Sequence, residues 1–345
     1  MMDQLVLGEK ELASWLQQTH TITSVVRLPG DASARRYYRV ETNSKTYIVM
    51  LMETFQEQKD SLPFLVIQKH LSTSGVDVPS ILNVDPERGF ILLEDLGDLT
   101  LLKKLQSATT GDTERYLYER VIDSLVRLQT SASPKEGSKD LEAFQLSFDH
   151  EKLMWEVNFT IENFYKTYLK RTLSSNDERV LVDSFSEICS LLASQPTVLT
   201  HRDFHSRNVM IIPKEGDSEA LRFVMIDFQD ARMGPRQYDL ASLLKDSYYQ
   251  LEETQISMLL DYYIARYEAA TSQVIDRAEF RRVFDLMSVQ RNFKAIGSFA
   301  SFLNKRGDAS YLKYIGNTFE NIRRQLLKYP EYSELREVLF HYYYF

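Results

Sequence analysis

A single cysteine, Cys189, occurs in the whole sequence, so an internal disulfide is impossible. Its apolar helical surroundings predict a small buried hydrophobic side chain. A secreted protein would more often carry paired cysteines. The chain starts MMDQLVLGEKELASWLQQ, with an early Asp and Glu and no long apolar core, which is unlike a signal peptide. We therefore expect a cytoplasmic protein.

Long apolar runs, dense basic runs and abundant glycine and proline are also missing. No apolar run approaches the ~20 residues that span a bilayer, so no membrane partner is expected. The net charge is −8 and no Lys/Arg-rich run accompanies it, so no nucleic-acid partner is expected. Only 12 Gly and 9 Pro occur in 345 residues, which argues against long disordered tracts. The 43% hydrophobic and 26% charged residues are typical of a globular protein, and the length suits two lobes.

The first part of the chain has the period and composition of strands, with one helix before them and one among them. Helical spacing of apolar residues occurs over 9–19 and around 62–71. Alternating β-branched and aromatic runs, separated by turn residues, predict five antiparallel strands. They are expected over 23–27, 37–41, 47–52, 80–84 and 90–94.

After Asp95-Leu96-Gly97-Asp98 the pattern becomes mostly helical. Helices are expected near 113–132, 149–170, 176–194, 238–250, 252–270, 276–303, 307–328 and 332–342, with short strands at 197–200, 209–212 and 223–226. The fold class is therefore α+β, with two lobes: a small antiparallel β-rich N-lobe over 1–96 and a larger, mainly helical C-lobe over 97–345.

The most informative stretch is 198–246, where polar loops flank two short apolar strands. The first loop offers Asp203 and Asn208, and Asp227 directly follows the second strand. Phosphoryl transfer needs an oriented acceptor hydroxyl and cations that hold the phosphates. A carboxylate can orient the hydroxyl and take its proton, and a carboxylate with an amide oxygen can hold Mg²⁺. These three side chains provide that inventory.

Two other chemistries are weighed against this one. His201, Asp203 and His205 alternate like residues of a strand and are an alternative set of transition-metal ligands. Asn208 and Asp227 favour phosphoryl transfer instead. The sequence has no Gly-x-x-x-x-Gly-Lys-Ser/Thr, which excludes a P-loop enzyme.

The same stretch resembles a known fold. His201-x-Asp203-x-x-x-x-Asn208, followed by Ile226-Asp227-Phe228, is similar to the catalytic and metal-binding loops of the protein-kinase-like fold. With Tyr238-Asp239-Leu240-Ala241 after it, the pattern resembles the aminoglycoside phosphotransferase and choline kinase branch. The resemblance implies that Asp203 is the catalytic base and that Asn208 and Asp227 hold Mg²⁺. It also implies that His201 and Asp239 support the loop.

A narrower resemblance rests on separated segments in order: GDASARRYYRV, GFILLEDLGD, HRDFHSRNVM, IDFQDARMGPRQYDLASLLKD and QRNFKAIGSFA. Together they are similar to the bacterial anomeric kinases of cell-wall sugar recycling. Those enzymes phosphorylate the C1 hydroxyl of N-acetylmuramic acid and N-acetylglucosamine. The resemblance implies ATP and Mg²⁺ as cofactors, with GTP left open, and a small sugar as the acceptor.

The nucleotide side departs from the usual kinase pattern. The lysine expected on the third strand falls near Met50, and no lysine is present there. Arg35 or Arg36 is the alternative, because arginine can clamp phosphate oxygens, and we choose Arg36. The phosphate-covering turn is reduced to Gly30, Asp31, Ala32 and Ser33, whose backbone N–H groups still suit phosphate. Glu94, Asp95 and Leu96 are either a solvated strand end or the hinge that binds adenine, and their position between the lobes favours the hinge.

The acceptor side is less determined. Trp155 and Glu156 lie on a helical face that is either core or a sugar-binding surface. Arg291 and Lys294 are either solvated or in contact with the lactyl carboxylate of N-acetylmuramate. His205 serves either loop packing or acceptor contact.

Competing functions remain. An aminoglycoside, choline or other small-molecule kinase would share the catalytic residues. A non-catalytic nucleotide-binding protein would explain the missing lysine. A protein kinase is disfavoured, because Ala-Pro-Glu is absent after Asp227 and the segment up to Tyr238 is short. The acceptor and the oligomeric state stay open.

Overall fold

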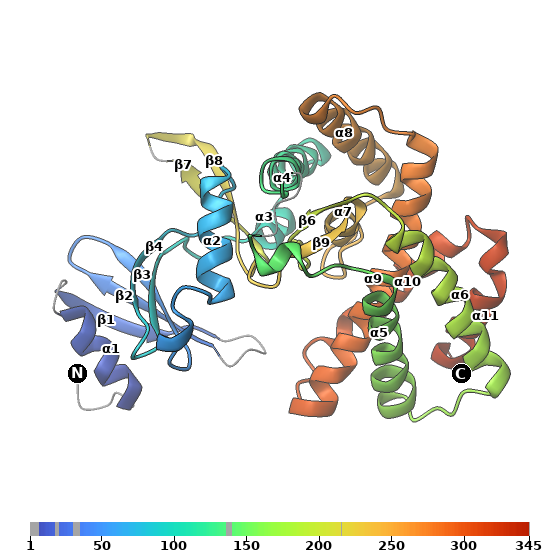
Figure 1. Cartoon of the computed structure of the whole chain (residues 1–345), viewed down its shortest axis with the longest axis horizontal. Helices are drawn as coiled ribbons and strands as arrows, with labels where there is room; N and C mark the ends of the chain where they lie inside the picture. Colours follow the sequence, from blue (N-terminus) through green and yellow to red (C-terminus); the bar gives the residue numbers. More distant parts are fainter. Residues whose placement is uncertain (1–6, 18–20, 30–34, 136–139, 215, 345) are drawn as a thin grey trace.

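The computed structural model describes residues 7–17, 21–29, 35–135, 140–214 and 216–344. Its N-lobe is a five-stranded antiparallel sheet in the order β1-β2-β3-β5-β4, shown in blue to teal in Figure 1. The strands are β1 (Ile22–Arg27), β2 (Arg36–Thr42), β3 (Thr46–Leu51), β4 (Ile81–Asp85) and β5 (Phe90–Glu94). All five expected strands are confirmed.

The two faces of this sheet are covered by different helices, because successive side chains of a strand point to opposite faces. Helix α1 (Leu7–Gln17) packs Leu12 and Trp15 onto the face that carries Tyr38, Val40 and Val49. Helix α2 (Pro63–Thr73) covers the other face and shares an apolar cluster with Met50, Ile91 and Leu93. The face of the sheet opposite α1 therefore packs toward α2 and the C-lobe.

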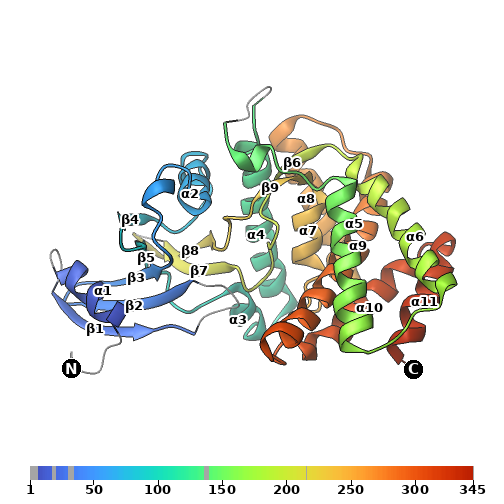
Figure 2. The same ribbon diagram turned by 60° about the horizontal axis from the view of Figure 1, so that its bottom comes forward.

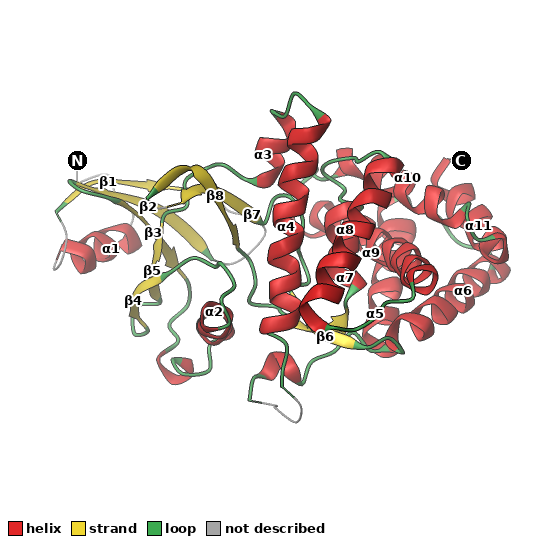
Figure 3. Ribbon diagram, turned by 90° about the horizontal axis from the view of Figure 1, so that it is seen from above, coloured by secondary structure: helices red, strands yellow, loops and turns green. Residues whose placement is uncertain are grey.

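The C-lobe is mainly helical and occupies the other end of the elongated molecule (Figure 3). Its helices are α3 (Leu101–Gln106), α4 (Gly111–Ser131), α5 (His150–Thr160), α6 (Ser175–Ala193), α7 (Gln237–Leu244), α8 (Glu253–Thr271), α9 (Arg277–Arg306), α10 (Ile315–Leu326) and α11 (Ser333–Tyr344). Its strands form two small antiparallel pairs: β6 (Thr197–Thr200) with β9 (Arg232–Pro235), and β7 (Val209–Lys214) with β8 (Asp217–Met225).

Helix α9 is the central element of the C-lobe, packed against α5, α6, α7 and α10 (Figure 2). Its ends are determined locally. The Asp276 side chain accepts hydrogen bonds from the N–H groups of Ala278 and Glu279, and Gly307 ends the helix with φ +69°. The helix expected over 276–303 is confirmed. The buried Cys189 of α6 is confirmed as well, and its pKa is raised to about 12 by burial.

Two expectations for the C-lobe were wrong in detail. The helix expected over 238–250 ends at Leu244, because the Asp246 carboxylate accepts from the Tyr248 N–H and turns the chain. The helix expected from 307 begins at Ile315, after an Asp308 side chain that accepts from the Ser310 N–H. Helix α3 and strand β9 were not predicted, since both are short.

A search of the described part of the chain for membrane-spanning helices found none with the required length and apolar character.

Helices α5 and α9 approach closely at Gly297. A Cβ atom there would lie 2.7 Å from the Thr160 Cα, and the Thr160 hydroxyl is already bonded to the carbonyl of Phe293 at 3.0 Å. We predict that Gly297→Ala lowers the free energy of unfolding by roughly 1–3 kcal/mol, because the helices must separate. Urea unfolding would measure the change.

Gly316→Ala in α10 is the matched control. Its Cβ would meet the Tyr343 Oη at 3.7 Å, an ordinary contact. Because alanine favours helix over glycine by up to ~1 kcal/mol, this variant should be as stable as the parent protein or more so. Equal losses in both variants would contradict the close-approach argument.

Candidate active site

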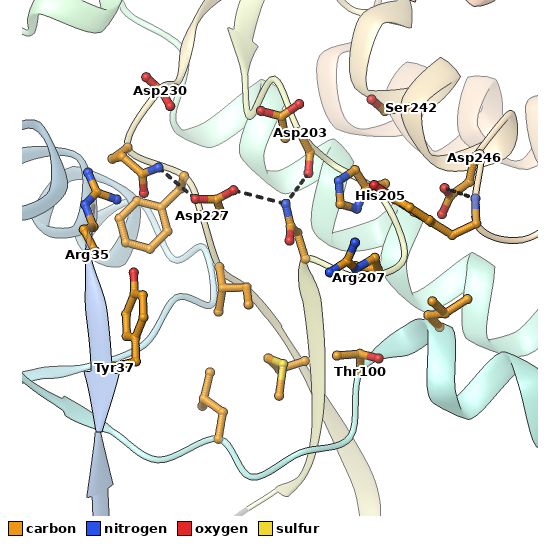
Figure 4. A pocket seen from close by; sticks show the side chains of 18 of the residues that line it. Arg35, Tyr37, Thr100, Asp203, His205, Arg207, Asp227, Asp230, Ser242 and Asp246 are labelled. Atoms are coloured by element: carbon orange, nitrogen blue, oxygen red, sulfur yellow. Dashed lines mark hydrogen bonds between the residues drawn. The ribbon is translucent and has the colours of Figure 1, made fainter. Parts of the chain in front are cut away.

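A cavity of about 1350 Å³ lies between the lobes and receives side chains from both. The N-lobe contributes the inner face of β2 and β3 and the segment after β5. The C-lobe contributes the loop 201–208, the segment after β8, the end of α7 and one face of α9. Every residue labelled in Figure 4 lines this cavity.

Helix α7 holds the loop 201–208 through hydrogen bonds. The fully buried Asp239 carboxylate accepts from the backbone N–H of His201 at 2.6 Å and from that of Arg202 at 3.0 Å. The His201 Nε2 donates to the carbonyl of Ile226 at 2.9 Å, which joins the loop to the end of β8. These contacts fit the loop-support role proposed for His201 and Asp239. Arg202, which lies between His201 and Asp203 in the chain, has φ +81°. This left-handed backbone conformation is unfavourable for arginine, so the surrounding contacts must stabilise it.

Asp203 projects from this loop into the cavity, with its side chain 30% exposed. Its Oδ1 lies 3.5 Å from the Lys294 Nζ of α9. Burial by itself would raise the pKa of Asp203, but the positive charges of Lys294, Arg291 and Arg202 outweigh it and hold that pKa well below its usual range. The carboxylate is therefore anionic and available to orient a hydroxyl.

Asp227 lies near Asp203 (Figure 4), and Asn208 contacts both residues. The Asn208 Nδ2 donates to the Asp203 carbonyl at 2.9 Å and lies 3.5 Å from the Asp227 Oδ2. The Gln229 Nε2 donates to the other Asp227 oxygen at 2.8 Å. Because the Asn208 Nδ2 donates to the loop backbone, the Asn208 Oδ1 is the atom of this side chain that can bind a metal ion. One amide oxygen beside one carboxylate fits Mg²⁺, which takes its other ligands from water and phosphate.

The alternative transition-metal site receives no support. In the part of the chain that the structure describes, no three His, Cys, Asp or Glu side chains converge on a point where a metal ion would be held. The His201 ring is turned to the Ile226 carbonyl, and the His205 ring packs edge-on against Tyr248 at 5.1 Å.

On the nucleotide side, strand parity separates the two candidate arginines. Arg35 lines the cavity, with its guanidinium 5.9 Å from the Phe64 ring. Arg36 has the parity of Tyr38 and Val40, which face α1, and it is exposed and lies outside the cavity lining. The structure therefore places Arg35 on the cavity and Arg36, the predicted phosphate contact, on the opposite face of β2. The physical reason is the two-residue period of β2, which turns Arg35 inward.

Met50, at the place of the missing lysine, is fully buried in the apolar cluster that includes Phe64. An apolar contact thus occupies the position where other kinases of this fold place a charge. The predicted phosphate-covering residues Gly30, Asp31, Ala32 and Ser33 lie outside the described residues.

The segment after β5 is not a solvated strand end. The Asp95 side chain is 5% exposed and pairs with the Arg39 Nε at 2.8 Å. Glu94 accepts from Arg222 at 2.9 Å, and Leu96 is buried with Met210 and Val224. Glu94, Asp95 and Leu96 all line the cavity. The two arginines were missed by sequence reasoning, because nothing local links β2 or β8 to this segment.

The acceptor-side predictions divide. Trp155 is 55% exposed, stacks on Phe159 and lies outside the cavity lining. Glu156 is buried against α9, where it accepts from Gln290 at 3.1 Å. The structure places neither side chain on the cavity: Trp155 is mostly exposed, and the face of α5 that carries Glu156 packs on α9.

His205, Arg291 and Lys294 do line the cavity, so the solvated alternative for the last two is wrong. Arg291 is buried, donates to the Arg202 carbonyl at 2.8 Å and lies over the Tyr238 ring. Burial lowers the pKa of His205 to about 3, and the nearby Arg291 adds to this effect, so the imidazole is neutral near pH 7.

An aromatic wall beside these residues was missed. It consists of Tyr248, Phe299, Phe302 and Tyr311. Arg207 lies against it, with its guanidinium 5.0 Å from the Tyr248 ring and 5.4 Å from that of Tyr311. The signal that could have found part of it is the spacing of Arg291, Ala295, Ser298 and Phe302, which share one face of α9.

Comparison with known proteins agrees with this geometry. The model of the phosphotransferase enzyme family (APH) matches residues 24–280. The N-acetylmuramate/N-acetylglucosamine kinase of Pseudomonas aeruginosa is 32% identical over 315 residues, 90% of this chain and 86% of that protein. The protein of the same name from Neisseria meningitidis serogroup B is 31% identical over 332 residues, 95% of this chain and 94% of that protein.

Solved structures show the same fold at lower identity. Choline kinase LicA from Streptococcus pneumoniae has a TM-score of 0.61 and 14% identity, covering 92% of this chain and 99% of its own. ADP-bound aminoglycoside phosphotransferase APH(2'')-Ib has a TM-score of 0.60 and 16% identity, covering 95% of this chain and 98% of its own. The two-lobed architecture predicted from the sequence is thus confirmed as protein-kinase-like. The chain is a small-molecule kinase that belongs to the APH phosphotransferase family.

Proposed function

We propose that this kinase transfers the γ-phosphoryl group of ATP to the anomeric hydroxyl of N-acetylmuramate or N-acetylglucosamine, a step in the recycling of cell-wall sugars. The observation that carries the proposal is the cavity itself. It places a charged Asp203 between a polar, aromatic-walled acceptor side and a nucleotide side formed by the N-lobe. The names of the relatives, which match over most of both chains, supply the sugar.

In this proposal Asp203 binds the C1 hydroxyl and receives its proton as the oxygen attacks the γ-phosphorus. Asn208 and Asp227 would hold Mg²⁺, which neutralises phosphate charge when bound. His201 and Asp239 act on Asp203 through the loop that they position. The neutral His205 is placed to contact the acceptor from the same loop.

The nucleotide would occupy the N-lobe side of the cavity. We propose that the backbone of the segment from Glu94 to Leu96 binds adenine, with the lobe boundary directly after Leu96. Ile48 and Leu93 line the cavity there as an apolar surface for the base. Arg35 takes the phosphate role, because it is the arginine of the pair that faces the cavity.

The acceptor side is not richly acidic, as a pocket for a cationic amine would be. Arg207, Arg291 and Lys294 line it together with the carboxylates of Asp203 and Asp246. The aromatic wall offers apolar surface for the faces of a sugar ring, as ligand pockets usually do. Similarity to choline and aminoglycoside kinases is therefore similarity of fold, and fold alone does not determine the substrate.

An acceptor panel tests the proposal directly. Mg²⁺-dependent ADP release should occur with N-acetylmuramate and N-acetylglucosamine, and should be weak or absent with glucosamine, kanamycin and choline. Turnover of an amine alone would contradict the proposed substrate while leaving the catalytic assignments in place. Nucleotide binding without turnover of any acceptor would favour the non-catalytic alternative.

The two adjacent arginines form a matched pair of variants. Arg35→Ala should raise the KM for ATP by roughly 10-fold or more, because a hydrogen bond to a charged group contributes about 1.5–3 kcal/mol. Arg36→Ala removes the same charge from the opposite face of β2 and should leave that KM within about 2-fold. Steady-state kinetics with varied ATP decides between them, and a larger effect of Arg36→Ala would reverse the assignment.

A further inference from the structure

Three positively charged side chains surround Asp203, but their other contacts differ. The Arg202 Nη1 lies 3.4 Å from Asp230, and Arg291 is buried with its guanidinium bonded to the loop backbone and stacked on Tyr238. Lys294 extends from α9 into the cavity and ends 3.5 Å from the Asp203 Oδ1. Among the described residues, it is the group whose ammonium reaches the catalytic carboxylate itself.

The position of Lys294 is well determined by α9. Lys294 shares its cavity-facing side with Arg291, Ala295 and Ser298, as expected from helical spacing. Its side chain is 17% exposed, so water screens its charge only partly. One turn away, Gly297 allows α9 to lie close against Thr160 of α5. The helix therefore presents the ammonium from a rigid support.

Phosphoryl transfer depends on positive charge around the moving group, since the negative charge is spread over its oxygens. The lysine that other kinases of this fold carry on the third strand is replaced here by Met50, which is buried among apolar side chains. A lysine ammonium is a compact charge with three donors, so it can contact a carboxylate and a phosphoryl oxygen at once. Lys294 lies 3.5 Å from the Asp203 carboxylate and lines the cavity in which the phosphoryl group would move.

We propose that Lys294 is a catalytic residue that donates a hydrogen bond to the phosphoryl group in transit while Asp203 binds the acceptor hydroxyl. This inference rests on the proposed function. The acceptor oxygen forms a bond to the γ-phosphorus, and the bond from that phosphorus to the leaving oxygen breaks, its electron pair departing with ADP. The hydroxyl proton passes to the Asp203 carboxylate. Lys294 donates its hydrogen bond and exchanges no proton.

This role differs from the sequence prediction that Lys294 meets the lactyl carboxylate of N-acetylmuramate. An ammonium beside the catalytic base lies where the reacting hydroxyl must bind. A group that recognises a substituent elsewhere on the sugar would affect the binding of the carboxylated sugar only. A group that contacts the phosphoryl would affect turnover of both sugars alike. Kinetics with the two acceptors therefore separates the two roles.

The test compares Lys294→Met with the parent enzyme on N-acetylglucosamine and N-acetylmuramate. We expect kcat to fall about 100-fold with both sugars, the magnitude typical for loss of one donor to a developing charge, while the KM values for sugar and ATP change less than about 3-fold. Lys305→Met is the matched control. Lys305 lies on the same helix, with its ammonium over the Phe159 ring of α5, and lies outside the cavity lining. Its removal should leave both constants unchanged.

An unchanged kcat in Lys294→Met, or a loss confined to the KM for N-acetylmuramate, would overturn the proposal. If Lys294→Met fails to fold by thermal unfolding, Lys294→Ala is assayed with added ethylammonium. Recovery of at least 10-fold in kcat would support the proposal, and no recovery in a folded variant would contradict it. Should the parent enzyme use neither sugar, the proposed function fails, and Lys294→Met is measured on the acceptor that is used or on ATP hydrolysis.

Discussion

The site depends on the hydrogen bonds that the buried Asp239 carboxylate accepts from the backbone of the loop 201–208. Taking a carboxylate out of water is costly unless hydrogen bonds replace the lost hydration. Here two backbone N–H groups, those of His201 and Arg202, replace part of the lost hydration, and these bonds hold the start of the loop 201–208. Arg202 can then keep its left-handed backbone, and Asp203 projects into the cavity.

A second carboxylate repeats this device at the other end of the loop. Asp246, just after α7, accepts from both the backbone N–H and the hydroxyl of Ser206. Burial raises the pKa of Asp246 to about 6, opposed by these bonds from Ser206 and by the N–H of Tyr248. Two aspartates therefore hold the loop 201–208 near both ends: Asp239 in the first turn of α7, and Asp246 just beyond its last turn.

The N-lobe is joined to the C-lobe by a shared apolar cluster, and ion pairs add to this contact. Arg39 of β2 pairs with Asp95 and Asp98 in the segment after β5. Arg222 of β8 pairs with Asp77 and Glu94, so a C-lobe strand is joined to the same segment. Partly buried pairs of this kind bind more strongly than exposed ones and specify geometry. They join β2 and β8 to Asp95 and Glu94, which line the cavity.

The sequence predicted most where the signal was local. Asp203, Asn208 and Asp227 come from two short motifs, and the structure brings them together because each follows or precedes a strand of the β7–β8 pair. The strands and long helices were predictable from period and caps. The sequence could not show which of Arg35 and Arg36 faces the cavity, because they differ only in strand parity and both are followed by tyrosines, Tyr37 and Tyr38.

The acceptor side could not be assembled from sequence, since it depends on how α5 and α9 pack. Glu156 and Trp155 share a helical face pattern with many core helices, and only the contact with Gln290 shows that Glu156 belongs to the α5–α9 interface. Tyr248, Phe299 and Tyr311 come from three separate segments. Their convergence is a property of tertiary packing.

The central claim is that Asp203 directs the phosphoryl group to an anomeric oxygen. The most direct measurement is phosphorus and carbon NMR of the product formed from ATP and N-acetylglucosamine labelled with ¹³C at C1. The account predicts a phosphorus resonance coupled to the labelled carbon, which disappears on mild acid treatment as the sugar 1-phosphate hydrolyses. A phosphorylated sugar without that coupling would place the phosphate on another hydroxyl and contradict the account.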